Sequence, residues 1–575
     1  MDNSSVSKLL DDISVLLELK EENAFKIRSY QKAASNIERL SESLADIYKK
    51  GGRRSLEEID GIGAGISERI EEILTTGKSS YLEELHKDIP KSVVEMLRIQ
   101  GVGPKLVIRL YKDLKIKSVE ELLSAAKKGI LKKLDGVREK KIESIIKGIE
   151  NYRKLDRKHL ISDALSYAQA LLKEIKSHDY VVDAVICGSL RRGKETIGDI
   201  DILATGINPK KLADAFVSLP QVKRAIAKGE TKSSVVLENG MNADLRMVGP
   251  ESFGSAAHYF TGSQQHNIKI RKLAISKGLK VSEYGVFRGN KKLAGRTESG
   301  LFKVLGLQFI PPELREDSGE IEAAARKAIP RLVELSDVKG DLHMHSDYTD
   351  GEVPIEEMAA AAKLLGYDYI AITDHSKSTT VAGGLDARSV EKQMREIDAL
   401  NKRLKDFRVL KGIEVDILKD GSLDLDDAVL AGLDLVIASV HSHFSMPGTA
   451  MTERVLKAMH NRYVSIIGHP TGRLIGKRQP YEIDMGAVIK EAAKTHTALE
   501  LNSFPDRLDL NDLNCRLAGE NGVRIAINTD SHRPADLSYM KFGIGTARRG
   551  WLTKNDVINT LSLERLLGFV SLKRK

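Results

Sequence analysis

The sequence GDLHMHSDYTDG (residues 340–351) decides how the second half of the chain folds. It places His343 and His345 at the end of a short apolar run, and Asp350 follows. Similar apolar runs recur in AITDHS, GIEVDI, IASVHSH, IIGHP and INTDSH. Short runs rich in Val, Ile, Leu and Ala, with helical sequence between them, predict buried parallel strands. The second half is therefore predicted to be a parallel α/β barrel.

Polar residues at the ends of these runs predict a metal centre, because the C-terminal strand ends form the functional surface of such a barrel. A lone histidine there is more often an ordinary polar residue. Six histidines and three carboxylates in one half of the chain favour metal binding instead. Nitrogen and oxygen ligands without thiolate suit zinc, manganese or iron, and such a pocket favours hydrolysis. The candidate ligands are His343, His345, Asp350, His375, Glu414, His441, His469, Asp530 and His532.

Residues 340–532 resemble a PHP domain (polymerase and histidinol phosphatase), a seven-stranded (β/α) barrel that holds three metal ions. Metal ions in such a site activate water and neutralise a phosphate. The resemblance implies three ligand sets: His343, His345, Glu414 and Asp530; Glu414, His441 and His469; and Asp350, His375 and His532.

Three further barrel residues are candidates for supporting roles. His443 lies two residues after His441, on the same side of an expected extended strand, and is a candidate for a position outside the metal ligands. Arg388 and Arg473 are candidates for phosphate contact, and the alternative for both is an ordinary solvated arginine.

The length of 575 residues predicts two or more domains. Hydrophobic residues make up 41% and charged residues 30%, which is typical of soluble globular proteins. The sequence has no run of eighteen apolar residues and no signal-peptide pattern, so no membrane association is expected. Two cysteines, Cys187 and Cys515, are too few for a disulfide framework. These features favour a cytoplasmic location.

The net charge of +9 is unevenly distributed. Residues 1–340 hold 59 Lys and Arg against 48 Asp and Glu, which leaves 31 against 33 in the remainder. The most basic stretch, 101–300, has 38 against 22. A surface that binds a polyanion is therefore expected in the first half. A generally lysine-rich composition is the alternative.

Two segments of the basic half repeat one pattern, IDGIGAGISERI (59–70) and IQGVGPKLVIRL (99–110). Each has a glycine turn followed by an amphipathic helix, whose first N–H groups can bind a phosphate without reading a base. A dinucleotide fingerprint is the alternative, but no strand precedes the turn. We interpret both as helix-hairpin-helix elements, with LDGVREKKI (134–142) as a degenerate third copy. The candidate DNA-binding residues are Gly61, Gly63, Gly65, Gly101, Gly103 and Lys105.

The segment VVDAVICGSLRRGKETIGDIDILAT (181–205) predicts a strand, a glycine turn and a second strand. Asp199 and Asp201 alternate with isoleucines and so face one side of that strand. NADLRMV (242–248) brings Asp244 on a later strand. Three carboxylates suit two Mg²⁺ ions, which can activate a 3′-hydroxyl and stabilise a pyrophosphate leaving group. A D-x-D pair alone is common on strands, but the glycine turn and the third aspartate favour catalysis. Gly188, Ser189 and Arg192 of the turn are candidates to bind a triphosphate.

This combination resembles the nucleotidyltransferase palm of family X DNA polymerases. YFTGSQQHNIKIR (259–271) is similar to their sugar- and base-contacting segment, and SEYGVF (282–287) to their thumb. YQKAASNI (30–37) with the first hairpin resembles their lyase-type domain. A family X core followed by a PHP domain is the architecture of the bacterial and archaeal enzymes (PolX). The resemblance implies that Tyr259 and Phe260 pack on the sugar, Gly262 and Ser263 shape the turn, Asn267 meets the base, and Arg271 meets the template.

Two positions depart from the family pattern. Arg69 stands where lyase-active relatives have the lysine that forms a Schiff base, and a guanidinium cannot take that role. Weak or absent lyase activity is therefore expected, unless Lys26 or Lys32 substitutes. Asn242 replaces an arginine that often precedes the third aspartate by two residues, so activation of the primer hydroxyl is expected to differ in detail.

The predicted fold is multidomain: α-helical helix-hairpin-helix domains, an α+β palm with a thumb, and a C-terminal (β/α)7 barrel. The predicted boundaries are an N-terminal lyase-type domain at 1–85, a second helix-hairpin-helix subdomain at 86–155, the palm at 156–248, the thumb at 249–315, a linker at 316–337 and the barrel at 338–575.

The resemblance implies a monomeric DNA-directed DNA polymerase for gap filling and base excision repair, with gapped or primed DNA and dNTPs as substrates. It implies Mg²⁺ in the palm and up to three Mn²⁺ or Zn²⁺ ions in the barrel. The barrel is expected to be a 3′-5′ exonuclease, and 3′-phosphatase or abasic-site endonuclease activity stays open. The alternatives are a barrel that serves only as a scaffold and one that hydrolyses small phosphoesters.

Overall fold

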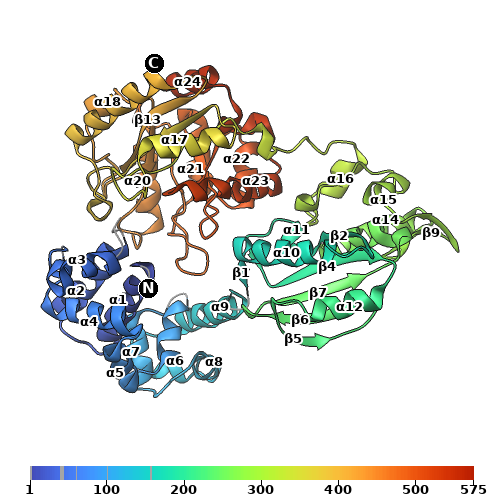
Figure 1. Ribbon diagram of the computed structural model, residues 1–575, viewed down its shortest axis with the longest axis horizontal. Helices are drawn as coiled ribbons and strands as arrows, with labels where there is room; N and C mark the ends of the chain where they lie inside the picture. Colours follow the sequence, from blue (N-terminus) through green and yellow to red (C-terminus); the bar gives the residue numbers. More distant parts are fainter. Residues whose placement is uncertain (1–2, 39–43, 60, 100–101, 156–157, 575) are drawn as a thin grey trace. The chain divides into compact units, whose positions relative to one another are not determined.

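The computed structural model describes residues 3–38, 44–59, 61–99, 102–155 and 158–574 (Figure 1). They fall into two compact units. The first comprises Met1–Arg157 with two short segments, Ser346–Pro354 and Lys377–Asp386; the second comprises Lys158–His345, Ile355–Ser376 and Ala387–Lys575. Among the described residues, no helix combines the length and apolar character needed to cross a membrane.

The first unit is helical, and its buried side chains form one core cluster that extends from Val6 to Ile149. Helices on both sides of residue 85 therefore share a core, although the sequence predicts a domain boundary there. The helices are α1 (Asn3–Leu19), α2 (Ala24–Glu38), α3 (Leu44–Glu57), α4 (Ala64–Thr76), α5 (Ser80–Asp88), α6 (Lys91–Glu95), α7 (Pro104–Lys112), α8 (Val119–Lys127) and α9 (Glu139–Leu155).

The three hairpin turns of this unit are each closed by the same type of backbone hydrogen bond. The backbone N–H of Ile62 donates to the carbonyl of Ile59, Val102 donates to Ile99 in the same way, and Val137 donates to Leu134, at 3.0, 3.0 and 3.1 Å. Gly61 and Gly136 have φ angles of 82° and 77°, which a residue with a side chain rarely adopts. The degenerate third copy is therefore closed by the same hydrogen bond as the first two.

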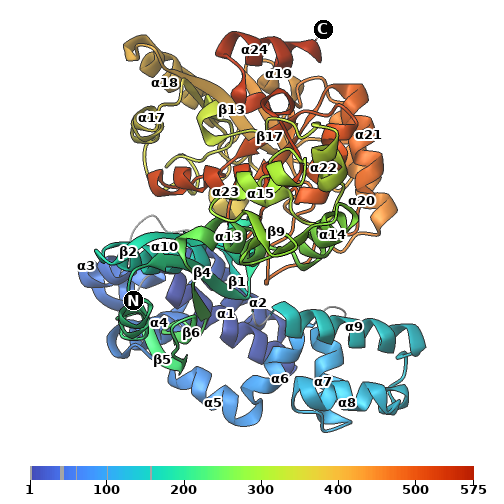
Figure 2. The same ribbon diagram turned by 90° about the vertical axis from the view of Figure 1, so that its right-hand side faces the viewer.

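The segment predicted as the palm contains a five-stranded sheet in the order β2-β4-β7-β6-β5. Strand β4 runs parallel to β7 and antiparallel to β2 (Figure 1). Helix α10 (Ile161–Lys176) lies beside β2 (Figure 2). Helices α10 and α12 (Pro209–Val217) contribute to the buried core of the sheet. The strands are β2 (Val181–Ile186), β4 (Asp199–Gly206), β5 (Val222–Ala227), β6 (Lys232–Leu237) and β7 (Asn242–Met247).

The segment predicted as the thumb contains a three-stranded antiparallel sheet and three helices. Helix α16 (Glu320–Ala325), inside the predicted linker, places Ile321 and Ala324 in the core of this part. The other elements are α13 (Phe253–Thr261), α14 (Gln264–Ser276), β8 (Lys280–Ser282), β9 (Gly285–Arg288), β10 (Lys291–Ala294) and α15 (Glu298–Val304).

The last part is a sheet of seven parallel strands in sequential order, and a helix follows each strand. A parallel bridge between Met344 and Ser531 joins the two ends of the sheet. The predicted (β/α)7 barrel is therefore confirmed. Its strands are β11 (Gly340–Asp341), β12 (Tyr369–Ile372), β13 (Arg408–Asp416), β14 (Leu435–Ser439), β15 (Ile466–Ile467), β16 (Ala498–Asn502) and β17 (Ile525–Asn528). Its helices are α17 (Ile355–Leu364), α18 (Ala387–Arg403), α19 (Asp427–Leu430), α20 (Gly448–Met459), α21 (Met485–Thr495), α22 (Asp512–Glu520), α23 (Met540–Arg549) and α24 (Leu563–Leu572).

Candidate functional site

The nine candidate ligands of the barrel lie at or near the C-terminal ends of its strands. The ligand atoms of His343, His345 and Asp530 lie within 4.8 Å of one another, and those of His375, Glu414 and His441 form a second such group. A third group contains His345, Asp350, His375 and His532. Eight of the nine residues thus fall into compact groups, and the assignment of each ligand to one ion stays a prediction.

Glu414 of β13 is the centre of this arrangement. One carboxylate oxygen, Oε1, lies 3.1 Å from Nε2 of His469 and 3.3 Å from Nε2 of His441. The other, Oε2, lies 2.8 Å from Nδ1 of His375 and 3.5 Å from Nε2 of His343. This carboxylate therefore brings His469 into contact with the ligand groups.

The electrostatics of the barrel site favour anionic carboxylates. Although burial opposes the shift, His441, His343 and His375 hold the pKa of Glu414 well below its usual range. Burial likewise opposes the low pKa of Asp530, which His343 and His345 maintain. Burial alone would lower the pKa of His441, but Glu414 raises it to about 9. Buried charged groups of opposite sign stabilise one another only in close contact, which these side chains have.

The donor set fits divalent cations. Nε2 of His343 and Oε2 of Glu414 are buried and lie 3.5 Å apart, too far for a good hydrogen bond between them. Imidazole nitrogens and carboxylate oxygens without thiolate suit zinc and manganese. The residues that would hold such ions are those of the three groups together with His469.

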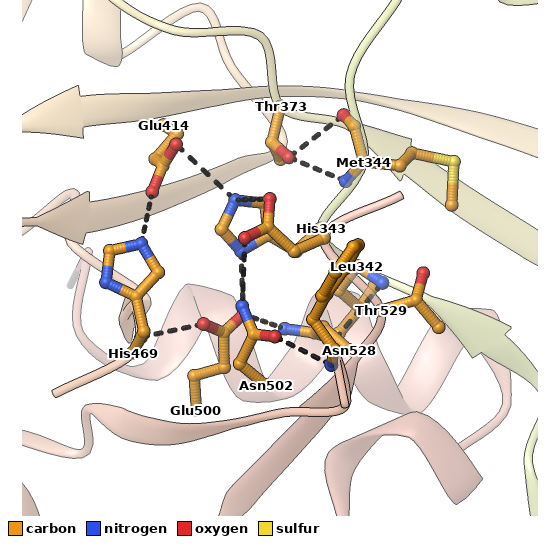
Figure 3. A network of polar contacts seen from close by, with 12 residues as sticks. Leu342, His343, Met344, Thr373, Glu414, His469, Glu500, Asn502, Asn528 and Thr529 are labelled. Carbon is orange, nitrogen blue, oxygen red and sulfur yellow. Dashed lines mark hydrogen bonds and ion pairs between the residues drawn. The ribbon is translucent and has the colours of Figure 1, made fainter. Parts of the chain in front are cut away.

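Glu500 is a site residue that the sequence analysis missed. Its Oε1 accepts a hydrogen bond from Nδ1 of His343 at 2.7 Å, and its Oε2 accepts one from the backbone N–H of His469 at 2.7 Å (Figure 3). Asn528 donates to the same carboxylate at 2.9 Å. With the proton on Nδ1, His343 presents a lone pair on Nε2 toward Glu414 and Asp530. The sequence TALELN (497–502) does indicate this residue, because a carboxylate interrupts an apolar run there, as in GIEVDI.

Replacing Glu500 with glutamine is expected to weaken Mn²⁺ binding by the barrel by about 10- to 100-fold, the usual effect of losing a carboxylate behind a histidine ligand. Metal titration followed by calorimetry measures the change. Glu520→Gln is the matched control, because Glu520 pairs with Arg516 on the exposed side of α22. Equal Mn²⁺ affinity in the unaltered protein and Glu500→Gln would contradict this role.

One expectation about supporting residues is wrong, and two stay open. Arg473 is not an ordinary solvated arginine, because its guanidinium pairs with Glu195 at 2.7 Å and donates to the carbonyl of Arg507 at 2.9 Å, and a phosphate contact stays a prediction. His443 is exposed and does not continue an extended strand, because β14 ends at Ser439 and the φ of His443 is 58°. Arg388 is exposed on α18, and a phosphate contact stays a prediction.

The palm aspartates lie on two adjacent parallel strands. Asp201 of β4 is paired in register with Asp244 of β7, and Asp199 lies two residues earlier on the same face. Burial raises the pKa of Asp201 to about 6, and the charges of Asp199 and Asp244 add to the rise. Lys232, which the sequence analysis did not single out, lies with its Nζ 2.7 Å from Oδ2 of Asp244. Among the described residues, the compact ligand groups are those of the barrel, and the palm aspartates do not form one.

The predicted nucleotide-binding turn follows β2 and passes beside Asp201. A Cβ on Gly188 would lie 2.2 Å from Oδ2 of Asp201, and the φ of Gly188 is 64°. Only glycine therefore fits at this position. Ser189 lies in the short helix α11 (Gly188–Arg191) and is half-buried. Arg192 follows α11; its Nε pairs with Glu316 at 3.0 Å and its Nη1 donates to the carbonyl of Thr261.

The second predicted nucleotide segment forms the junction of α13 and α14. Tyr259 and Phe260 are in edge-to-face contact with ring centroids 5.2 Å apart. Gly262 has a φ of 71°, and Ser263 accepts a hydrogen bond from the N–H of His266 as the cap of α14. The buried side chain of Asn267 donates to the carbonyl of Tyr259 at 2.7 Å. Arg271 lies one turn later on α14. The base and template contacts of Asn267 and Arg271 stay predictions.

The predicted DNA-binding residues of the first unit cluster at helix starts. Gly63 and Gly103 precede α4 and α7, and Gly65 and Lys105 lie in the first turns of those helices. Gly61 lies in the first hairpin turn, where a Cβ in place of its hydrogen would lie 3.0 Å from the side chain of Lys32. Gly101 lies outside the described residues.

The position of the lyase lysine is occupied by Arg69 on α4, whose guanidinium stacks over Tyr81 at 4.8 Å. The Nζ of Lys26 lies 5.5 Å from the centroid of the same ring. A hydrogen bond with Tyr81 raises the pKa of Lys26, which keeps its amine protonated and poorly nucleophilic.

Borohydride is therefore expected to trap little covalent adduct between the protein and DNA with an abasic site. Arg69→Lys is the matched variant, because it restores an amine at this position. Adduct yields are measured on denaturing gels. An equal, high yield from both proteins would contradict the expectation.

Comparison with known protein families identifies the kinds of domain in the chain. Models of protein families match as follows: a helix-hairpin-helix domain at 1–79, a SAM-like helix-hairpin-helix tandem at 93–151, the DNA polymerase beta palm at 162–254, the DNA polymerase beta thumb at 256–316 and the PHP domain at 341–503. The predicted fold class is thereby confirmed.

Relatives of two kinds are similar to the chain. The "DNA polymerase/3′-5′ exonuclease PolX" of Bacillus subtilis (strain 168) is 40% identical over 574 residues, 99% of each chain. A "probable phosphatase" of Thermoanaerobacter sp. (strain X514) is 30% identical over 232 residues, 38% of this chain and 89% of the relative. Another, from Caldicellulosiruptor saccharolyticus, is 33% identical over 193 residues, 32% of this chain and 75% of the relative. The full-length similarity and the order of matched domains lead to one conclusion: the chain belongs to the family X DNA polymerases that carry a C-terminal PHP domain (PolX).

Proposed function

We propose that the palm adds deoxynucleotides to the 3′ end of a DNA primer. The observation that carries this assignment is the β4–β7 register, which pairs Asp201 with Asp244 and places Asp199 on the same face. The glycine turn at 188–193 begins beside Asp201, where its N–H groups and Arg192 can bind the triphosphate. The full-length similarity to a DNA polymerase/3′-5′ exonuclease supports the same assignment.

The three aspartates would hold two Mg²⁺ ions, which supply charge neutralisation at the attacking and leaving oxygens. Asp201 must lose its proton to bind a cation, and its pKa of about 6 allows this at neutral pH. Lys232, on the adjacent strand β6, forms an ion pair with Asp244. The chain's own contribution is to fix these carboxylates on a rigid sheet and to keep Gly188 free of a side chain.

The barrel is proposed to remove nucleotides from 3′ ends. Its histidines and carboxylates would hold up to three Mn²⁺ or Zn²⁺ ions, which supply an activated water and neutralise phosphate charge. Glu414 supplies both carboxylate oxygens to the surrounding imidazoles, and Glu500 orients His343. All nine ligand positions have a residue able to bind a metal, which argues against a barrel that serves only as a scaffold.

The substrate is proposed to be gapped or primed DNA, as in base excision repair. The helix-hairpin-helix turns place helix N-termini in position to bind backbone phosphates without reading bases. The monomeric state and the cytoplasmic location stay predictions.

A second candidate activity of the barrel is removal of a terminal 3′-phosphate. The observation in its favour is the similarity to probable phosphatases, whose matches cover 38% and 32% of this chain. A phosphomonoester and a phosphodiester require similar chemistry from the metal site.

One assay on a 5′-labelled primer in a gapped duplex tests the proposal. With Mg²⁺ and dNTPs the primer is expected to grow to the end of the gap. With Mn²⁺ and without dNTPs it is expected to shorten in steps of one nucleotide. A primer that ends in a 3′-phosphate distinguishes the two barrel activities. Removal of the phosphate leaves the number of nucleotides unchanged, whereas exonuclease activity shortens the primer. A primer that neither grows nor shortens would contradict the proposal.

A further inference from the structure

Helix α23 of the barrel lies against the nucleotide turn of the palm. The turn ends at Gly193, where a Cβ would lie 3.7 Å from Cδ of Arg549 and 3.9 Å from the carbonyl oxygen of Gly545. Phe542, from the same helix, is buried in the core cluster of the palm. The barrel therefore contributes side chains to the immediate surroundings of this turn.

Arg549, at the C-terminal end of α23, joins the barrel to the turn through its guanidinium. Nη1 donates to the carbonyl oxygen of Arg192 at 2.9 Å and to Oε1 of Glu316 at 3.0 Å. Nε and Nη2 donate to Oδ2 of Asp512 on α22, at 2.9 and 2.6 Å. The side chain is 5% exposed. A planar guanidinium that is hydrogen-bonded on both edges has little conformational freedom. The bonds to Asp512 therefore let the barrel fix its position.

Glu316 extends this contact to the side chain of Arg192. Its Oε1 accepts hydrogen bonds from Nε of Arg192 and from Nη1 of Arg549, both at 3.0 Å, and Nζ of Lys194 lies 3.4 Å away. Although burial opposes the shift, Arg192, Lys194 and Arg549 hold the pKa of Glu316 below its usual range, so it is an anion. Both the backbone and the guanidinium of Arg192 are thus held by a network that includes Arg549.

We propose that Arg549, a residue of the PHP barrel, is a positioning residue of the polymerase site that sets the nucleotide turn for triphosphate binding. The inference rests on the proposed function of the palm. It assigns to the barrel a role in synthesis that is separate from its metal centre. The nearest barrel ligand by sequence, His532, precedes Arg549 by seventeen residues, and Arg549 hydrogen-bonds with Arg192, Glu313, Glu316 and Asp512.

The neighbouring Arg548 provides a matched control. It lies on the same helix and also pairs across the junction, with Glu313 at 2.8 Å and the carbonyl of Val333 at 3.1 Å. Within the part of the chain that the structure describes, its hydrogen-bond partners Glu313 and Val333 lie outside the turn at 188–193. Both arginines contact the segment 313–316, but of the two, among the described residues, only Arg549 hydrogen-bonds to Arg192.

The test measures steady-state incorporation of one dNTP into a gapped primer by the full chain. Arg549→Ala is expected to raise the KM for dNTP about tenfold, the effect of losing one charge-assisted hydrogen bond, with kcat changed less than about twofold. Arg548→Ala is expected to leave the KM unchanged. Shortening of a labelled single strand with Mn²⁺ is expected to be equal in all three proteins, which shows that the barrel is folded.

Asp512→Asn serves as a second variant, because it loosens Arg549 without removing it. It is expected to raise the KM for dNTP by about threefold, a smaller change in the same direction. A normal KM in both Arg549→Ala and Asp512→Asn, or an equal rise in Arg548→Ala, would overturn the inference and leave the proposed function intact. Failure of the unaltered chain to incorporate dNTPs would overturn both.

Discussion

Asp199→Ala is expected to abolish DNA synthesis and leave DNA degradation intact. The substitution removes one of the three carboxylates on the paired strands β4 and β7. Loss of a metal carboxylate costs several kcal/mol of transition-state stabilisation, which corresponds to a rate at least about 1000-fold lower. Primer extension with Mg²⁺ and dNTPs measures the loss.

The control for this variant is Asp214→Ala. Asp214 lies on α12 of the same palm, half exposed, and pairs with Lys228. Its removal is expected to leave extension unchanged. If Asp199→Ala lost extension and shortening together while remaining folded, the assignment of two separate sites would be wrong.

His343→Ala is expected to have the opposite effect, with shortening lost and extension kept. His343 is fully buried, its Nδ1 is held by Glu500, and its Nε2 lies 3.5 Å from Glu414 and 3.6 Å from Asp530. Alanine removes a metal ligand and leaves Glu500 without its partner. Shortening by the barrel is expected to fall about 1000-fold, because metal ions supply several kcal/mol to such hydrolysis.

His460→Ala is the matched control in the barrel. His460 is 64% exposed and contacts Glu491, away from the ligand groups. Shortening by this variant is expected to match that of the unaltered chain. Persistent shortening by His343→Ala at the normal rate, with Mn²⁺ as the added metal, would contradict the assignment of the barrel site.

The sequence predicted the barrel, and the structure brings most of the candidate ligands together, because strand ends in a parallel sheet share one edge. The candidate positions came from apolar runs that contain or end in histidines and carboxylates, and the sheet order follows the chain. The palm carboxylates were predictable for a related reason, since alternation along β4 fixes the face of Asp199 and Asp201.

Contacts between distant segments were not predictable in the same way. Arg473 pairs with Glu195, 278 residues earlier, and Arg549 reaches Arg192 over 357 residues. No local pattern specifies such partners, because they depend on how the barrel packs on the palm. The position of His443 was predicted wrongly because the sequence pattern did not indicate that β14 ends at Ser439. Glu500 has the same local pattern as Glu414, a carboxylate inside an apolar run, and the sequence analysis did not single it out.

The central claim is that one chain contains two metal-dependent sites with opposite effects on a 3′ end. The most direct test follows one 5′-labelled primer in a gapped duplex with Asp199→Ala, with His343→Ala and with the unaltered chain. Without dNTPs and with Mn²⁺, the unaltered chain and Asp199→Ala are expected to shorten the primer, and His343→Ala is not. With dNTPs and Mg²⁺, the unaltered chain and His343→Ala are expected to extend it, and Asp199→Ala is not. Loss of both activities in either folded variant would contradict the claim.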